Sequence, residues 1–517
     1  MTKTRSPSET GWAPLAVLLA GTFMIVLDFF IVNVAIPSMQ GELHAGSGAI
    51  EWVLTGYGLI FATLMITAGR LGDQHGRRRM FSLGLALFTL ASAGCGAASS
   101  PTVLVLARVV QGIGAALLSP QVLSTFGVIY SGPDRARAFG AYGIVAGLAA
   151  AGGQLIGGVL VQANLLGLGW RSCFLINVPV GLLALALAPR LVPESRAQRA
   201  SRLDVTGTVL VTLGLTAIVL PLVDGRQHGW PAWTWLCLGA APLVLGAFAA
   251  HQRFLHRRGG APLLDPSLFR ERSFTAGLVT QIAFWCGQAS FFLILALYLQ
   301  QGRGLTALGA GLVFTIMAAA YLATSMAAPA LTARHGPRVV ADGGLTLAAG
   351  HALLLASVAE IGTAGAVGAL APALILIGAG MGLLITPLMT IVLTDLDPET
   401  AGAASGTLNT AQQVGNSIGV ALIGVIFFGA LPRGYAHAFE LSLAALAGLL
   451  VAVAALSRLL PRPALPSPAA VPSPPGRPEP PGRPEPAAPS APSPPAAPSA
   501  GAVAGAQAAP RVLSTRP

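Results

Sequence analysis

The sequence predicts an all-α integral membrane protein with fourteen transmembrane helices. Of its 517 residues, 54% are hydrophobic and only 9% are charged, whereas a soluble chain carries roughly 25% charged residues. The hydrophobic residues fall in runs of about twenty, the length that crosses a hydrocarbon core of roughly 30 Å. Arginines gather in alternate loops between these runs, as in membrane proteins. A soluble protein with one large core would show shorter apolar elements, so that class is disfavoured.

The apolar runs place each span in turn. The first run, 13–36, is longer than a signal-peptide core, so we interpret it as an uncleaved first span. The seventh and eighth spans are the least well defined, and without them the count would be lower by one pair. We expect spans near 13–36, 50–68, 80–98, 102–126, 137–161, 172–190, 204–223, 232–254, 273–299, 307–331, 339–359, 363–394, 404–429 and 436–457.

The basic residues predict the orientation. The net charge is +11, but the arginines are spread over many short loops and form no basic face, so no nucleic-acid partner is expected. With the N-terminus inside, the outer loops hold only Arg171, Arg226, Arg303 and Arg433. The asymmetry predicts that both termini are cytoplasmic. We expect a multi-pass protein of a bacterial cytoplasmic membrane, with the lipid bilayer as its surroundings and no obligatory protein partner.

The sequence shows no sign of an enzyme. It lacks a nucleotide-binding GxxxxGK[ST] motif and a nucleophile elbow. The four cysteines, Cys95, Cys173, Cys237 and Cys286, form no CxxC pair, which disfavours a disulfide framework or a metal site. We therefore expect no catalytic residue, no metal and no cofactor.

A weak internal repeat suggests two halves. GRLGDQHGRRR at 69–79 and PALTARHGPR at 329–338 both place His-Gly in a short basic inner loop, and parallel repeats build many transporters. We expect a cytoplasmic N-terminus at 1–12, a six-helix bundle at 13–190, two inserted helices with flanking loops at 191–272 and a second six-helix bundle at 273–457. The Pro/Ala-rich segment 458–517 is expected to be a disordered cytoplasmic tail.

Two ionisable residues lie deep in predicted spans. Asp28 is nine residues before Pro37, and Arg108 is seven residues after Pro101, so at 1.5 Å per residue both lie roughly 10–14 Å below the outer surface. Charges inside a membrane are costly and indicate function. Asp28 is the best candidate for a proton or cation site, with Arg108 beside it; a structural ion pair is the alternative. Gln111, one turn after Arg108, extends the polar face.

The loop between spans two and three contains a candidate conformational latch. Its members are Gly69, Asp73, Gly76 and Arg77. Glycines, Gly72 included, permit a sharp reversal, and Asp73 can pair with the arginines or cap a helix. If these contacts exist in one conformation only, they bias the equilibrium between states. Ordinary orienting charge explains the arginines but not Asp73.

Glycines and polar residues mark three further spans. Span five has glycines at helical spacing, which permits tight packing or a hinge. Span nine carries an aromatic face with one amide, which suits an amphipathic ligand but could also face lipid. Span thirteen has a polar stripe that lines a cavity or joins helices. The candidate cavity residues are Asn33, Gln111, Phe284, Gln288, Phe291, Asn409 and Gln413.

Five segments carry a family resemblance over about residues 12–457. LDFFIVNVAIP at 27–37, GRLGDQHGRRR at 69–79, LARVVQGIGAA at 106–116, WRSCFLINVPVG at 170–181 and LDVTGTVLVTLGLTAIVLPL at 203–222 together resemble the major facilitator superfamily, and within it the fourteen-span drug:proton antiporters. The resemblance implies two six-helix bundles that rock about a central cavity, with two inserted helices. It implies proton coupling at Asp28 and Arg108 and a latch at Asp73 and Arg77.

The resemblance also implies an antiport motif in span five. Its residues here are Gly143, Gly147, Gly153, Gln154, Gly157 and Gly158. Gln154 stands where the motif usually has proline, which removes a kink and adds an amide. The loop of the second half has Ala333 where Asp73 would correspond.

The leading functional hypothesis is efflux of drugs, antibiotics or other amphipathic small molecules, driven by the proton-motive force. The alternatives are a dedicated exporter of one natural product, a proton-coupled uptake symporter, and a receptor or scaffold that transports nothing. Replacing Asp28 by Asn separates the first from the last, because a scaffold does not depend on a coupling carboxylate.

Overall fold

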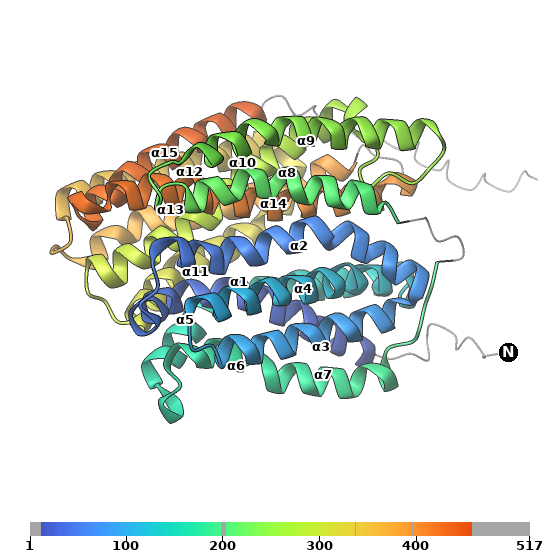
Figure 1. Ribbon diagram of the computed structural model, residues 1–517, viewed down its shortest axis with the longest axis horizontal. Helices are drawn as coiled ribbons and strands as arrows, with labels where there is room; N and C mark the ends of the chain where they lie inside the picture. The colour runs from blue at the N-terminus through green and yellow to red at the C-terminus, as the bar shows by residue number, and fades with distance from the viewer. Residues whose placement is uncertain (1–11, 198–202, 337, 395–397, 458–517) are drawn as a thin grey trace, which may run out of the picture. The chain divides into compact units, whose positions relative to one another are not determined.

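The computed structural model describes residues 12–197, 203–336, 338–394 and 398–457, and within these ranges it contains helices and no strand. Predictions for the first eleven residues and for the tail at 458–517 lie outside these ranges. Figure 1 shows the arrangement of the helices. The long helices are α1 (Ala13–Leu43), α2 (Ser47–His75), α3 (Arg77–Gly96), α4 (Pro101–Ile129), α5 (Gly132–Ala163), α7 (Asn177–Leu191), α8 (Val205–Asp224), α9 (Ala232–Arg257), α10 (Arg272–Leu297), α11 (Ala307–His335), α12 (Arg338–Ile361), α13 (Ala371–Thr394), α14 (Pro398–Ala430) and α15 (Tyr435–Ser457).

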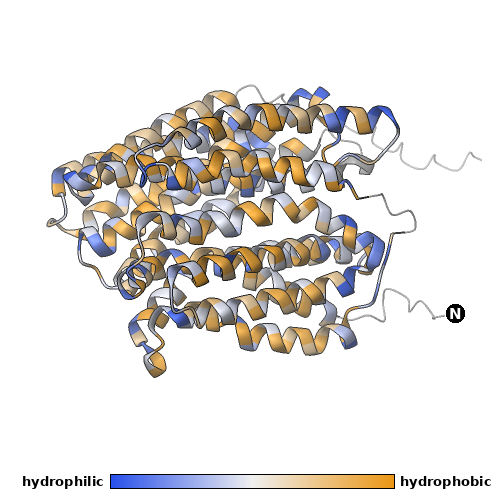
Figure 2. Ribbon diagram, viewed as in Figure 1, coloured by the Kyte–Doolittle hydropathy of each residue, from blue (hydrophilic) through white to orange (hydrophobic). Residues whose placement is uncertain are grey.

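Fourteen helical segments of the described chain are long and apolar enough to cross a membrane. The sixth runs over Gly169–Leu191 and joins the short helix α6 (Ser172–Leu175) to α7. The ninth continues from α10 through a π-helical turn at Tyr298–Gly302. Hydrophobic residues cover the helices along their length, and hydrophilic residues gather at their ends (Figure 2). The fourteen-span fold class predicted from the sequence is confirmed.

Local sequence sets where the helices begin and turn. Ser100 accepts a hydrogen bond from the Val103 N–H at the start of α4, and Pro101 occupies the first helical position, where no backbone donor is needed. Gly76 and Gly336 separate α2 from α3 and α11 from α12, with φ of 112° and 61°. These left-handed values favour glycine, so the two loops of the predicted repeat use the same turn residue.

Gly69 and Gly72 do not contribute to this turn, contrary to the sequence prediction. Both lie inside α2. A Cβ on Gly72 would lie 1.9 Å from Oε1 of Gln121 on α4, and one on Gly69 would lie 3.6 Å from Pro120. These glycines therefore permit close packing of α2 on α4, and Gly76 alone makes the reversal.

Helices α1–α7, the N-terminal bundle, enclose a core that includes Phe81, Phe88 and Phe126. Within it α4 packs on α2 and α3. A Cβ on Gly112 would lie 2.7 Å from the Tyr57 carbonyl oxygen, so these helix backbones nearly touch. In the C-terminal bundle, α10–α15, helix α13 packs on α11 and α12, and α10 packs on α14.

The inserted helices α8 and α9 pack on each other, and α8 also contacts α2 and α14. The hydroxyls of Thr67 on α2 and Thr208 on α8 are 2.7 Å apart. At the start of α8, Asp204 accepts hydrogen bonds from the Gly207 N–H, His251 and Gln252 at 2.7–2.8 Å. Burial alone would raise the pKa of Asp204, but these hydrogen bonds hold it below its usual value. The cluster fixes α9 to the start of α8.

The two bundles meet along α5–α11 and α2–α14. They are held together at the end of the molecule where α1 finishes. There Gln300 donates to the Val34 carbonyl oxygen and Gln301 to Oε1 of Gln40, both at 2.9 Å. The bundles are therefore closed against each other at this end.

Candidate functional site

A cavity of about 1030 Å³ lies between the two bundles. It is large enough for a drug-sized molecule, since ligand pockets span roughly 300–1,000 Å³. Helices of both bundles line it, so a relative movement of the bundles changes its shape. Its described lining includes Ile25, Val26, Phe30, Phe61, Met65, Arg77, Arg135, Phe139, Tyr142, Gly143, Gly147, Gln154, Trp285, Phe292, Phe314, Met317, Tyr321, Asn409, Gln412 and Gln413.

The two ends of the cavity differ. Arg77 and Arg135 belong to it where α3 and α5 begin. Toward the end where the bundles close, the rings of Phe30, Phe292 and Phe314 form a cluster. The ring centroid of Phe292 lies 5.2 Å from that of Phe30 and 5.9 Å from that of Phe314. These rings come from α1, α10 and α11, so they join the bundles across the cavity. The cavity thus reaches the end that carries the α2–α3 loop and is shut at the other.

Two of the predicted cavity residues, Asn409 and Gln413, line this cavity. Phe284, Gln288 and Phe291 do not: all three are at most 1% exposed. The ring of Phe291 instead packs on His351 of α12, with centroids 4.8 Å apart. The prediction for this face of α10 is wrong, because a helix turns by about 100° per residue and the neighbouring side chains of Trp285 and Phe292 face the cavity.

Asn33 and Gln111 also lie outside the main cavity. Asn33 donates to the carbonyl oxygens of Phe29 and Phe30 in its own helix. It lines a separate void of about 10 Å³ with Asn416 and Ser417 of α14. A void of this size holds about one water molecule. Gln111 belongs to a buried network inside the N-terminal bundle. Contrary to the sequence prediction, neither Asn33 nor Gln111 lines the main cavity.

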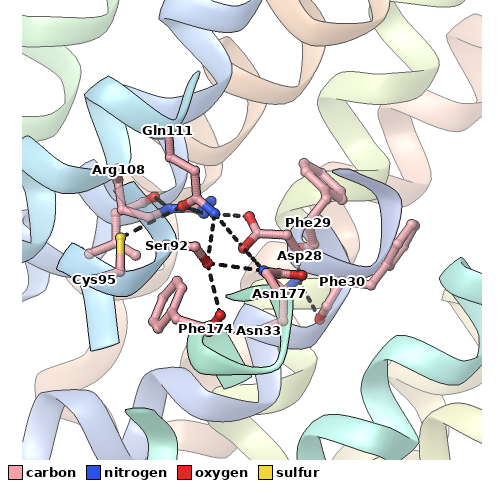
Figure 3. Close-up of polar contacts among 11 residues, drawn as sticks. Asp28, Phe29, Phe30, Asn33, Ser92, Cys95, Arg108, Gln111, Phe174 and Asn177 are labelled. Atoms are coloured by element: carbon pink, nitrogen blue, oxygen red, sulfur yellow. Dashed lines mark hydrogen bonds and ion pairs between the residues drawn. The ribbon is translucent and has the colours of Figure 1, made fainter. Parts of the chain in front are cut away.

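The structure pairs Asp28 directly with Arg108 (Figure 3). Nη1 of Arg108 is 2.5 Å from Oδ2 of Asp28, and neither side chain is exposed. Gln111 donates to the other oxygen, Oδ1, at 2.8 Å, and Asn177 of α7 donates to it at 3.2 Å. Arg108 also donates to the Val53 carbonyl oxygen at 2.9 Å. The sequence placed Asp28 and Arg108 at one depth but missed Asn177.

The Asp28 network joins four helices of one bundle. Its members come from α1, α4, α7 and, through Ser92, α3. The Arg108 guanidinium also lies 4.2 Å from the ring centroid of Tyr57 on α2. Asp28 is not among the described residues that line the cavity, whereas Val26 and Phe30, two residues to either side, are. In this conformation the carboxylate is sealed from both the cavity and the membrane.

The antiport-motif residues of α5 divide into three groups. Gly143, Gly147 and Gln154 line the cavity. Gly153 and Gly157 pack on α1: a Cβ would lie 2.9 Å from Phe30 and 2.8 Å from Ile31, respectively. A Cβ on Gly158 would instead lie 2.7 Å from the Ala307 carbonyl oxygen of α11. The motif therefore serves the cavity, the interior of one bundle and the joint between bundles.

Asp73 and Arg77 of the candidate latch form an ion pair with an N–O distance of 2.8 Å. Arg77 also reaches toward the Ser124 carbonyl oxygen at 3.4 Å. The chain after α7 crosses this loop. Its Ser195 carbonyl oxygen accepts from the Arg77 N–H at 2.9 Å, and its Ala197 N–H donates to the Asp73 carbonyl oxygen at 3.1 Å. The loop is thereby fixed to the linker that leads to the inserted helices.

The structure contains a second buried carboxylate that the sequence predictions did not include. Glu51, near the start of α2, is fully buried and pairs with Arg226 of the α8–α9 loop at 3.0 Å. The Arg226 guanidinium lies 5.0 Å from the ring centroid of Phe428 on α14. Glu51 lies at the predicted edge of a span, where a charge is unremarkable, and its partner is far away in sequence. It joins three separate parts of the chain at the closed end.

No group of three or more metal-ligating side chains occurs within the described ranges. The four cysteines form no disulfide with one another. The site is therefore built from a cavity, buried ion pairs and close helix contacts, and it contains the elements of a carrier that works by moving two bundles about a central cavity.

Comparisons with known proteins agree that this is a carrier with two helix bundles about a central cavity. The family model described as Major Facilitator Superfamily matches residues 18–420, and the chain belongs to this superfamily. It is 39% identical over 426 residues to the probable actinorhodin transporter of Streptomyces coelicolor, covering 82% of this chain and 74% of that protein. It is 36% identical to the cephamycin export protein CmcT of Amycolatopsis lactamdurans over 81% of this chain and 86% of that protein.

A third relative is the puromycin resistance protein pur8 of Streptomyces alboniger, 36% identical over 88% of this chain and 92% of that protein. Among solved structures, a bacterial homologue of the human lysosomal transporter Spinster, in an inward-facing and unoccupied conformation, matches with a TM-score of 0.62 at 18% identity. That match covers 89% of this chain and 98% of the other. The protein is a multi-pass transporter of a bacterial cell membrane.

Proposed function

We propose that the protein exports amphipathic small molecules from the cell in exchange for protons. The observation that carries this proposal is the pairing of a drug-sized cavity with a buried Asp28–Arg108 ion pair in the bundle that forms one wall of it. The names of the related export and resistance proteins support the direction of transport. The energy source is the proton-motive force, and neither a catalytic step nor a cofactor is required.

The conformation suggests one half of the transport cycle. The cavity reaches the end where Arg77 and Arg135 lie, which the arginine distribution assigns to the cytoplasm. A substrate would enter there, since Gln300, Gln301 and the aromatic cluster close the other end. Separation of α5 from α11 at the closed end would then release the substrate outside.

The proton would act through Asp28. Protonation removes the negative charge of Asp28 and weakens its attraction to Arg108. Because the network joins α1, α3, α4 and α7, a change there alters how these helices pack. Gln111 and Asn177 can continue to hydrogen-bond the neutral carboxyl group. The structural alternative, a permanent ion pair, predicts no dependence of transport on the charge of Asp28.

Efflux from cells that express the protein tests this function. A panel of dyes and antibiotics is measured with and without a protonophore, beside Asp28→Asn. The matched control is Asp134→Asn, since Asp134 is 57% exposed and its ion pair with Arg137 is at the surface. We expect efflux that stops with the protonophore and with Asp28→Asn, and continues in the control.

Each result has a defined meaning. Protonophore-sensitive efflux that survives Asp28→Asn contradicts the coupling role and leaves the export role intact. Accumulation of substrates in place of efflux indicates an uptake symporter. Absence of movement of any compound, with the protein present in the membrane, contradicts broad drug export and favours a narrow natural-product exporter or a scaffold.

A further inference from the structure

Gln154 is a buried amide that has no hydrogen-bond partner in the described part of the chain. It is 3% exposed and lines the cavity. Neither its Oε1 nor its Nε2 makes a hydrogen bond with any described residue. A buried amide left unpaired is costly, and both Gly153 and Gly157 beside it are closely packed on α1. Helix packing therefore holds Gln154 in place, while its amide remains available to a molecule in the cavity.

Trp285, in the opposite bundle, carries a second polar group that is unpaired among the described residues. Its indole Nε1–H is buried and has no acceptor among the described residues, and its side chain lines the same cavity. Nε1–H is a donor only, whereas an amide both donates and accepts. Gln154 belongs to α5 and Trp285 to α10, so one molecule that satisfies both would touch both bundles.

The charge of the lining limits what that molecule can be. Its described charged side chains are Arg77 and Arg135, and no described aspartate, glutamate or lysine lines it. Arg77 is paired with Asp73. Arg135 makes no ion pair with a described carboxylate, and its guanidinium lies 5.8 Å from the ring centroid of Phe139. A cation would meet positive charge in this cavity, and an anion would meet no described negative charge.

We propose that Gln154 and Trp285 bind the transported molecule directly, and that it is an aromatic, oxygen-rich compound that is uncharged or anionic. Its oxygens accept from the Trp285 Nε1–H and the Gln154 amide, and its ring system packs among Phe30, Phe292 and Phe314. Arg135 attracts a negative group at the open end. This deepens the proposed export function and names the substrate class of the same cavity.

Binding of ordered water by the same groups is the alternative that the experiment distinguishes from binding of the transported molecule. The test measures binding to the purified full-length protein, so it requires neither a proton gradient nor Asp28. The probes are fluorescein and rhodamine 123, which share a three-ring oxygen-containing scaffold but carry opposite charge. Fluorescence anisotropy gives the Kd of each. Failure of proton coupling therefore cannot be confused with failure of this proposal.

We expect fluorescein to bind more tightly than rhodamine 123. Gln154→Leu and Trp285→Phe each remove hydrogen-bonding atoms and leave an apolar side chain in their place. Each should weaken fluorescein binding by roughly five- to tenfold. Gln162→Leu, an exposed position on the same helix, and Trp233→Phe, 37% exposed on α9, should leave the Kd unchanged. Gln154→Glu adds a negative charge and should reverse the preference toward rhodamine 123.

Two sets of results would overturn the proposal. Tighter binding of rhodamine 123, or no binding of fluorescein to a folded protein, overturns the assigned charge. An unchanged fluorescein Kd in both Gln154→Leu and Trp285→Phe shows that these groups serve water alone. Gln154→Glu provides the independent check, since a charge added beside the probe changes its Kd even where a lost hydrogen bond does not.

Discussion

Valine at Gly157 and valine at Gly158 should damage the protein in different ways, although the two positions are adjacent. A Cβ on Gly157 would lie 2.8 Å from Cγ1 and 3.0 Å from the carbonyl oxygen of Ile31, in the same bundle. A Cβ on Gly158 would lie 2.7 Å from the Ala307 carbonyl oxygen and 2.9 Å from Cα of Leu308, in the other bundle. Only the second contact breaks when the bundles separate.

The size of the effect follows from these distances. Carbon atoms at optimal contact lie about 3.5–4.0 Å apart, and the backbone atoms of α11 cannot rotate away as a side chain can. Overpacking of this kind costs roughly 1–3 kcal/mol. At Gly158 the penalty applies only to the conformation closed at this end, and about 2 kcal/mol shifts such an equilibrium roughly thirtyfold. At Gly157 it applies to every conformation and lowers the stability of the fold.

Two measurements separate these outcomes. Spin labels at the exposed positions Gln162 on α5 and Leu312 on α11, in a background with the native cysteines replaced by serine, report the separation of the helices. Thermal unfolding of the purified protein reports stability. We expect Gly158→Val to populate longer distances at an almost unchanged melting temperature, and Gly157→Val to lower the melting temperature at unchanged distances.

The reasoning fails if the two variants behave alike. Longer distances in both would mean that α1 and α5 do not move as one body. A lowered melting temperature in both, with no change in distance, would mean that the contact between Gly158 and α11 persists throughout the cycle. Gly140→Val is the control, because Gly140 is not a described lining residue of the cavity and no described atom beyond its own helix backbone and chain neighbours lies within 4 Å of its Cβ position.

Three further predictions concern the ion pairs. Arg226→Gln should cost roughly 3 kcal/mol of stability, because it leaves the fully buried Glu51 without its partner. Glu51→Gln should cost clearly less, because Arg226 is 18% exposed and can turn to water. Thermal unfolding compares the two variants, and equal losses would contradict this prediction. Asp204, with its lowered pKa, contributes stability that is present above about pH 4 and is lost as the pH falls further; Asp204→Asn should flatten that acid limb of a stability–pH curve, and an unchanged limb would count against it. Asp73→Asn should slow transport with little change in melting temperature, since its partly exposed ion pair with Arg77 contributes at most about 1 kcal/mol. Parallel transport and unfolding assays measure both effects, and full transport would remove the latch role.

The sequence was sufficient to predict those features that the membrane constrains strongly. Apolar runs of fixed length specify the spans, and charges inside them are rare, so Asp28 and Arg108 stood out and a count of residues put them at one depth. Asn177 could not be found in this way, because amides are common and nothing in the sequence brings α7 to α1.

Rotation about a helix axis was the main obstacle to predicting the cavity. The face of α10 was placed correctly in the chain but incorrectly in space: Phe284, Gln288 and Phe291 form a real stripe, yet it packs inside the bundle. Helical periodicity alone shows that a helix has an apolar face, but it does not show which neighbouring helix or cavity that face contacts. Glu51 was missed for a related reason, since its meaning depends on Arg226, which reaches it only through the packing of α8 on α2.

The positions of the charges bear on how coupling works. Asp28 is sealed inside the N-terminal bundle, whereas the described charges of the cavity are arginines. Proton and substrate therefore do not compete for one side chain in this conformation, and the coupling must pass through helix movement. The shortest route is α1 itself: Asp28 faces α4 on one side, and Phe30 meets Gly153 of α5 on the other, next to Gln154. A proton on Asp28 that loosens α1 would thus shift the amide that we assign to the substrate.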